Sequence, residues 1–206
     1  MTEAEPLIAA TLFEDRIDVA RDFARELGAR GEELGLIGPL EPARLWSRHI
    51  LNSVLLAPML RPGLVGDIGS GAGLPGLVLA IARPDVEFVL VEPMERRVDW
   101  LRSEASRLGL GNVRVERARA EEAPLVEQLD QVTARAVASL AKLIPMTAPL
   151  AKRGGELIFM KGERVDDEVA AAAKQIRSAR LRDVAVVVLG EGIVPEVTRV
   201  FRATVD

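Results

Sequence analysis

One short segment combines glycines with an acidic residue in a spacing that suits nucleotide binding. Residues 67–76 read Asp-Ile-Gly-Ser-Gly-Ala-Gly-Leu-Pro-Gly, between the apolar run 64–68 and the helix-length stretch 75–82. A glycine-rich turn from a strand into a helix lets a ligand approach the backbone closely. Pro75 suits the first turn of that helix, where its missing N–H is not needed. The segment therefore predicts a nucleotide-type binding loop at a helix N-terminus.

The glycines alone do not choose the ligand, because residues 71–76 also fit the Gly-x-Gly-x-x-Gly dinucleotide fingerprint. Three acids favour S-adenosylmethionine. Asp67 places a carboxylate at the strand end, where it could attract the ligand's ammonium directly or through water. Glu92 ends the next strand, where it can accept hydrogen bonds from both ribose hydroxyls, and Glu121 follows the third strand, suited to an adenine pocket. Within the loop, we expect cofactor contacts at Gly69, Gly71 and Gly73.

NAD is the alternative cofactor, because Glu92 would bind its ribose equally well. A short-chain dehydrogenase needs a tyrosine, however, and the sequence has none. Many other dehydrogenases use a histidine. The single one, His49, lies before the predicted sheet rather than at a later strand end. Hydride transfer is therefore the less favoured chemistry.

The composition excludes several other chemistries. The 206 residues include no cysteine and one histidine, which excludes disulfides, thiolate zinc sites, cysteine nucleophiles and multi-histidine metal sites. We expect no metal. Glu3 and Glu5 stand where a signal peptide would carry positive charge, and no apolar run approaches the roughly 18 residues of a membrane helix. We therefore expect a cytoplasmic protein that does not enter the membrane.

The net charge of −4 is unevenly distributed along the chain. Residues 1–43 carry 10 acids and 4 bases, whereas residues 44–206 carry 21 acids and 23 bases. The field around the longer segment is thus not hostile to an anion. This distribution permits a nucleic-acid partner without requiring one.

The elements that must position these residues form an alternating pattern from residue 64 onward. Such alternation of strands and helices predicts an α/β fold with a mostly parallel sheet covered on both faces. The predicted strands are 64–68, 87–91, 113–115, 131–134, 156–160, 184–189 and 197–200, and the predicted helices are 75–82, 95–108, 139–150 and 165–178. The last two strands lack a helix between them and could form an antiparallel hairpin at one edge.

Helical patterns also precede the sheet. Apolar residues recur at three- and four-residue steps over 3–27, and a second helical stretch covers 43–56. No linker separates these helices from the sheet. We therefore predict a single domain, 1–206, with an N-terminal helical cap (1–60) packed on an α/β core (61–206), and we expect a monomer.

Several further motifs carry a resemblance to a known family. They are Arg48-His49-Ile50-Leu51-Asn52-Ser53, the loop 67–76, Arg83-Pro84-Asp85, Arg96-Arg97-Val98, Arg119-Ala120-Glu121, Ala134-Arg135-Ala136 and Lys161-Gly162. From about Trp46 to its end, the sequence resembles the ribosomal RNA small subunit methyltransferase G family, also called the glucose-inhibited division protein B family.

The resemblance implies a Rossmann-like class I methyltransferase fold with a seven-stranded sheet. It also implies S-adenosylmethionine-dependent methylation of guanine N7 in 16S rRNA, with the rRNA or the small ribosomal subunit as partner. The cofactor contacts that it implies are Gly69, Leu74, Ala120, Glu121 and Arg135. Members often carry His-x-x-Asp-Ser, where this chain has Asn52, and many have an Asn-Leu-Thr stretch where residues 35–42 differ. Both departures concern RNA contacts of the cap more than the cofactor site.

Methylation of guanine N7 is consistent with the residues and motifs that the sequence lacks. Guanine N7 carries an accessible lone pair, so an enzyme has chiefly to align it with the methyl carbon and the sulfur. No general base is required, and we assign no catalytic residue. The absence of cysteine excludes the covalent route to pyrimidine carbons, and residues 134–136 lack the Asn/Asp-Pro-Pro-aromatic loop of exocyclic-amine methyltransferases.

Basic and aromatic residues give weaker signals. Arg135 ends the fourth strand, where it could clamp the methionine carboxylate or touch guanine O6; the resemblance favours the cofactor role. We expect Trp46 and Trp100 in the core and His49 as a satisfied packing histidine. The predicted RNA contacts are Arg48, Arg96, Arg97 and Lys161. A small-molecule methyltransferase and a non-catalytic module that binds cofactor or RNA are the alternative functions.

Overall fold

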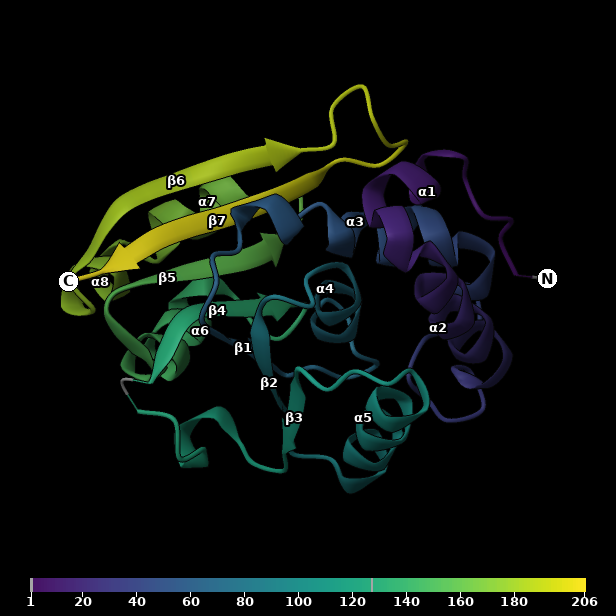
Figure 1. Cartoon of the computed structure of the whole chain (residues 1–206). Coiled ribbons are helices and arrows are strands. Elements are labelled where there is room, and N and C mark those ends of the chain that lie inside the picture. The colour runs from purple at the N-terminus through teal and green to yellow at the C-terminus, as the bar shows by residue number, and fades with distance from the viewer. Residues whose placement is uncertain (1, 127) are drawn as a thin grey trace.

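A seven-stranded sheet in the order β3-β2-β1-β4-β5-β7-β6 organises the chain. The computed structural model describes residues 2–126 and 128–206. The strands are β1 (Leu64–Ile68), β2 (Glu87–Val91), β3 (Val113–Glu116), β4 (Leu129–Arg135), β5 (Ala151–Lys161), β6 (Leu181–Leu189) and β7 (Thr198–Val205) (Figure 1). Strands β1 to β5 run parallel, and β7 lies antiparallel to both β5 and β6. The predicted mostly parallel sheet with an antiparallel last pair is confirmed.

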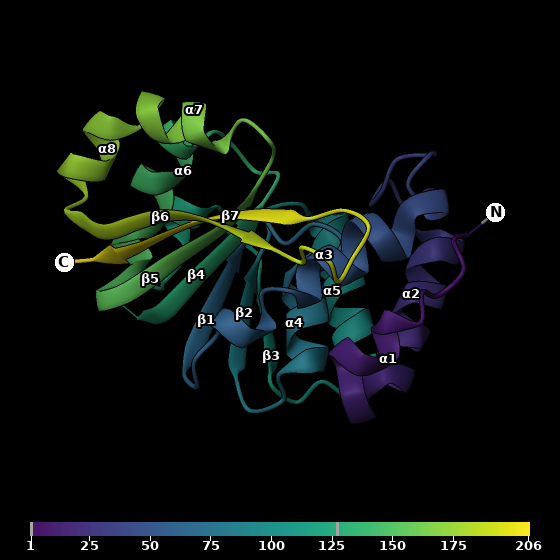
Figure 2. The same ribbon diagram turned by 90° about the horizontal axis from the view of Figure 1, so that it is seen from above.

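Helices cover both faces of the sheet, as predicted. Figure 2 shows α6, α7 and α8 on one side and α1 to α5 on the other. The helices that follow strands are α4 (Gly76–Ala82), α5 (Glu95–Arg107), α6 (Leu140–Thr147), α7 (Val165–Ala171) and α8 (Ala173–Ser178). Strand residues alternate between the two faces, so that Ile158 packs with the α4 side and Phe159 with the α6 side.

Two predicted helices are shorter than expected. The stretch 139–150 contains α6, which has Pro145 within it, and ends in the 3₁₀ turn η6 (Ala148–Leu150). The stretch 165–178 divides at Ala172 into α7 and α8. Conversely, β7 extends to Val205 rather than to residue 200. Its exposed Arg202 interrupts the apolar run, although strand pairing continues beyond it.

The N-terminal region is helical, as predicted, and packs on α4. Its elements are α1 (Ile8–Phe13), η1 (Glu14–Arg16), α2 (Ile17–Arg30), η2 (Pro42–Arg44), the π-helical turn η3 (Leu45–Ile50), α3 (Leu51–Val54) and η4 (Ala57–Met59). Phe23 and Ile50 from this region share one buried cluster with Leu77 and Ile81 of α4. Trp46 and Trp100 are each 4% exposed, which confirms that both are core residues. Among the described residues, every helix is too short or too polar to span a bilayer.

Candidate active site

The predicted glycine loop connects β1 to α4 at the carboxyl edge of the sheet. Gly69 has a φ of +71°, and a Cβ at this position would lie 2.7 Å from Cγ2 of Val137. At Gly76, a Cβ would lie 2.5 Å from the Asp67 carboxylate. A left-handed backbone and these close approaches both require glycine. The loop can therefore adopt this conformation only with glycine at these two positions.

Asp67 lies beneath the loop. Its carboxylate is fully buried and accepts hydrogen bonds from the Gly76 N–H at 3.1 Å and from Oγ1 of Thr133 at 3.2 Å. Burial raises the pKa of Asp67 to about 6, and the nearby Glu92 charge adds to the rise. In this geometry, Asp67 ties the start of α4 to β1 and β4. Its predicted contact with the cofactor's ammonium stays a prediction.

Glu92 joins the loop to the end of β2. The side chain is 2% exposed and accepts hydrogen bonds from the Gly71 N–H and the Met94 N–H, each at 3.0 Å. Arg97 approaches the same carboxylate, with Nη1 at 3.9 Å from Oε2. Both carboxylate oxygens retain a further lone pair, because an ionised carboxylate accepts about four hydrogen bonds. Its predicted contact with the ribose stays a prediction.

A cavity of about 380 Å³ lies between this loop and the cap. Its lining comprises Leu36, Ile37, Gly38, Glu41, Arg48, His49, Gly69, Ser70, Gly71, Ala72, Leu74, Arg97, Arg135 and Ala136. Four residues predicted to contact the cofactor are therefore brought together here: Gly69, Gly71, Leu74 and Arg135. Trp100 fixes the wall behind them, because its indole N–H donates to the Ala72 carbonyl at 3.0 Å.

Arg97, a predicted RNA contact, is a residue of the smaller cavity. It lines the smaller cavity next to Glu92, and its buried Nε has no hydrogen-bond partner among the described residues. Adjacent helix positions point about 100° apart, so Arg96 faces elsewhere. Arg96 lies against Gly35 in the cap and outside this cavity. The sequence alone does not show that these two neighbouring arginines have different surroundings.

Arg135 connects the sheet to the cap. Its Nη2 donates to the Arg48 carbonyl at 3.1 Å and lies 2.7 Å from Nδ1 of His49. Its Nη1 lies 3.4 Å from the His49 carbonyl and 3.5 Å from Oγ of Ser53. Burial lowers the pKa of Arg135 to about 10, and the Arg48 charge contributes. The strand-end position was predicted from the sequence, but these cap contacts were not.

His49 lies between Arg135 and Glu41. A guanidinium has only donors, so Nδ1 of His49 accepts and its proton resides on Nε2, which bonds Oε2 of Glu41. Burial and the Arg135 charge lower the pKa of His49 to about 4, against the opposing effect of Glu41. The imidazole is therefore neutral at pH 7. The expected satisfied packing histidine is confirmed, and it also lines the smaller cavity.

A larger cavity, of about 900 Å³, adjoins the first. The two cavities are adjacent, because Arg48, Arg135 and Ala136 line both of them. The larger cavity lies where β4 and β5 end and β7 begins. Its polar lining includes Arg44, Asn52, Lys161, Glu163, Glu168, Glu196, Thr198 and Arg199.

Most of the cations around the larger cavity are paired with acids. Lys161, whose side chain is 9% exposed, contacts Oε2 of Glu168 at 2.7 Å and donates to the Ala138 carbonyl. Arg44 contacts Glu196 at 2.7 Å, and Arg48 lies 3.7 Å from the same carboxylate. The basic side chains that line the cavity are thus oriented by ion pairs with neighbouring acids.

Five predicted cofactor contacts lie outside the smaller cavity's lining: Asp67 and Glu92, described above, and Gly73, Ala120 and Glu121. Ala120 and Glu121 begin the 3₁₀ turn η5 (Ala120–Glu122), which follows β3 at the same sheet edge. Ala120 is buried, whereas Glu121 is exposed. Gly73 is also absent from the lining, and a Cβ there would overlap Leu77. Their cofactor contacts stay predictions.

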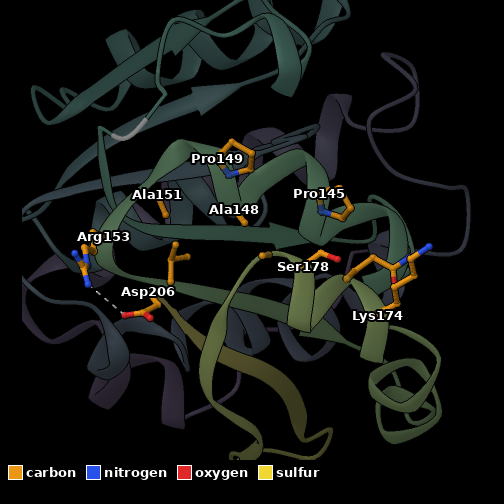
Figure 3. A pocket seen from close by; sticks show the side chains of 11 residues that line it. Pro145, Ala148, Pro149, Ala151, Arg153, Lys174, Ser178 and Asp206 are labelled. Atoms are coloured by element: carbon orange, nitrogen blue, oxygen red, sulfur yellow. Dashed lines mark ion pairs between the residues drawn. The ribbon is translucent and has the colours of Figure 1, made fainter.

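A third cavity, of about 540 Å³, lies at the opposite end of β5. Figure 3 shows its lining, with Arg153 and Asp206 at one end, Pro145 and Lys174 at the other, and Ala148 and Pro149 between them. Arg153 and Asp206 approach to 3.8 Å. This cavity is remote from the carboxyl edge where open α/β sheets bind ligands.

Among the described residues, no group of three or more His, Asp and Glu side chains is arranged to hold a metal ion.

Solved structures establish the fold class. A SAM-dependent methyltransferase from Aquifex aeolicus superposes with a TM-score of 0.59 at 20% identity, covering 80% of this chain and 94% of that one. The tRNA (m1A58) methyltransferase TrmI from Aquifex aeolicus gives 0.59 at 14% identity, covering 75% and 68%. At these identities the likeness concerns the fold alone. It confirms the predicted Rossmann-like class I methyltransferase fold.

Sequence comparison extends the likeness to a family. The chain is 68% identical to ribosomal RNA small subunit methyltransferase G from Clavibacter michiganensis subsp. michiganensis, over 98% of this chain and 96% of that protein. It is 47% identical to the protein of the same name from an Arthrobacter species, over 100% and 96%. A family model described as GidB: rRNA small subunit methyltransferase G matches residues 16–197. The chain therefore belongs to the rRNA small subunit methyltransferase G (GidB) family.

Proposed function

We propose that this chain transfers a methyl group from S-adenosylmethionine to N7 of a guanine in the 16S rRNA of the small ribosomal subunit. The observation that carries the proposal is the pair of cavities that meet at Arg48, Arg135 and Ala136. Methyl transfer needs a donor and an acceptor held in line at close range. Two adjoining compartments at the carboxyl edge of one sheet meet that requirement. Family membership supports the rRNA substrate.

The smaller cavity is the proposed donor site, and its residues fit the cofactor. Gly69 and Gly71 leave the backbone accessible, and Leu74 offers an apolar wall. Glu92, which is outside the lining but bonds the Gly71 N–H, has lone pairs for the two ribose hydroxyls. S-adenosylmethionine supplies an electrophilic methyl carbon on a sulfonium. Because guanine N7 attacks with a lone pair that is already free, the chain's residues have only to bind and orient. We therefore assign no general base.

The remaining predicted cofactor residues receive supporting roles in this proposal. Asp67 and Gly73 maintain the loop, and Ala120 and Glu121 form the side of the site beyond β3. Arg135 faces both cavities and can pair with the carboxylate of the donor's methionine part. We propose that Arg97 contributes to the same cavity.

The RNA is proposed to cover the larger cavity and the cap beside it. Arg48 and Lys161 are the predicted RNA contacts that line that cavity. Arg96 is exposed on α5 and can contact RNA beyond the cavity. One chain forms both cavities, so cap (1–60) and core (61–206) act as one domain, and a monomer suffices. We place the reaction in the cytoplasm, where small subunits are assembled.

Mass spectrometry of 16S rRNA nucleosides tests the proposal. Cells that lack this protein should lose one 7-methylguanosine, and the purified protein with labelled S-adenosylmethionine should restore it. Transfer to a small metabolite but not to rRNA would favour a small-molecule methyltransferase. Cofactor binding without transfer to any cellular RNA would favour a non-catalytic module. Comparing deproteinised rRNA with intact subunits would identify the form that is methylated.

A further inference from the structure

Asn52 carries a buried polar atom that lacks a partner beside the larger cavity. The residue lies on α3, lines that cavity and is 9% exposed. Its Oδ1 has no hydrogen-bond partner among the described residues. Its backbone carbonyl accepts a hydrogen bond from Oγ1 of Thr198 at 3.3 Å, which fixes the residue against the start of β7. The backbone of Asn52 is therefore held in place, whereas its side-chain oxygen is unsatisfied.

A buried amide oxygen without a donor is uncommon and calls for a specific explanation. Two of the donors in the cavity are already used, since Lys161 bonds Glu168 and Ala138, and Arg135 bonds the cap. A ligand in the cavity can supply an N–H. The terminal torsion of an asparagine is broad, so the oxygen can turn toward the cavity. Guanine carries N–H donors at N1 and N2, on the side of the base away from N7, whereas N1 of adenine is an acceptor.

Arg199 supplies an independent observation in the same cavity. It begins β7 next to Thr198, pairs in register with Lys161 and lines the cavity. Arg44, Arg48 and Lys161 each have a carboxylate within 4.0 Å. Among the described residues, no carboxylate lies within that distance of Arg199. Its five N–H donors suit the oxygens of a phosphate group.

We propose that the larger cavity binds the target guanosine itself, with Oδ1 of Asn52 accepting a hydrogen bond from the N1–H or N2 amino group and Arg199 holding an adjacent phosphate. The proposal rests on the proposed function, because it assigns the acceptor side of the same reaction. Asn52 is then a specificity-determining residue, and Arg199 an anchor for the backbone.

Replacing Asn52 tests whether its side-chain oxygen recognises the guanine. Initial rates with labelled S-adenosylmethionine would be measured on small subunits from cells lacking the protein. N52L should lower kcat/KM for the rRNA at least tenfold while calorimetric affinity for the donor stays unchanged. N52D, which retains acceptor oxygens, should keep at least a third of kcat/KM. Wild-type rates in N52L, or an equal fall in both variants at unchanged melting temperature, would overturn the assignment.

Replacing Arg199 tests the anchor and remains informative if N52L does not fold. The slope of log affinity against log salt should decrease by about one in R199Q, because one phosphate contact is lost. Arg177 on α8 is a matched control, since it is exposed and also has no carboxylate within 4.0 Å among the described residues. R177Q should leave the slope unchanged, and equal slopes in R199Q and wild type would overturn the anchor. Failure of the wild-type protein to methylate rRNA would instead contradict the proposed function.

Discussion

Arg135 and His49 form a contact that ties the carboxyl edge of the sheet to the cap, with Nη2 of Arg135 at 2.7 Å from Nδ1 of His49. Both residues line the smaller cavity, and Arg135 lines the larger one too. The arginine that lines both cavities is therefore oriented by a histidine from another part of the chain. A cap that shifted would move this guanidinium as well.

We expect R135A to weaken S-adenosylmethionine binding at least tenfold. The substitution removes a charged group from the cavity together with its hydrogen bonds to the Arg48 and His49 backbone. Isothermal titration calorimetry measures the affinity, and thermal melting reports whether the cap has loosened. R177Q, remote from both cavities, serves as the control. An affinity equal to that of the wild-type protein would contradict the role of Arg135 in donor binding.

The environment of His49 predicts a stability that falls in acid. Burial and the charge of Arg135 lower the pKa of His49 from 6.5 to about 4 in the folded chain. The unfolded chain therefore binds this proton first, so the stability is fully present above pH 6.5 and is lost as the pH falls toward 4. Denaturant unfolding of the wild-type protein and H49Q at several pH values isolates the effect. The stability advantage of the wild-type protein should shrink over this interval; an advantage independent of pH would contradict the prediction.

The sheet was predictable because its central strands are buried runs of apolar residues. Buried parallel strands such as β1, β2 and β4 show such runs directly in the sequence. The end of β7 was missed because its exposed Arg202 breaks the run, although pairing with β5 continues. Hydrophobicity therefore identified the strands that are covered on both faces and underestimated those nearer the sheet edge.

The site was predictable as far as local sequence determines geometry. The glycine loop and Glu92 follow from their positions at strand ends, and the structure places them together. Three other features depend on contacts between distant segments: the cavity position of Arg97, the cap contacts of Arg135 and the unpaired oxygen of Asn52. No spacing in the sequence encodes such contacts. For Asn52 the sequence did give one indication, because this chain has asparagine where members of the family often have aspartate.

Replacing Glu92 should weaken binding of the proposed donor. Its carboxylate bonds the Gly71 and Met94 amides, so E92A removes both the ribose acceptor and a tie between the loop and β2. We expect the affinity for S-adenosylmethionine to fall at least tenfold in E92A, measured by calorimetry. E92Q keeps one acceptor oxygen and should bind between the two. A wild-type protein that binds NAD in preference to S-adenosylmethionine would contradict the donor assignment as a whole.

The steric requirement at Gly69 can be separated from its backbone strain. Gly69 and Gly109 have similar φ values, +71° and +64°, so alanine at either position incurs about 1–2 kcal/mol of left-handed strain. A Cβ at Gly69 would lie 2.7 Å from Val137, whereas nothing lies within 4 Å of one at Gly109. G69A should therefore be less stable than G109A in denaturant unfolding. It should also bind S-adenosylmethionine more weakly, because a displaced loop no longer presents its backbone to the donor, whereas G109A should bind it as the wild-type protein does. Equal stability and equal affinity in the two variants would show that the loop tolerates a side chain at Gly69.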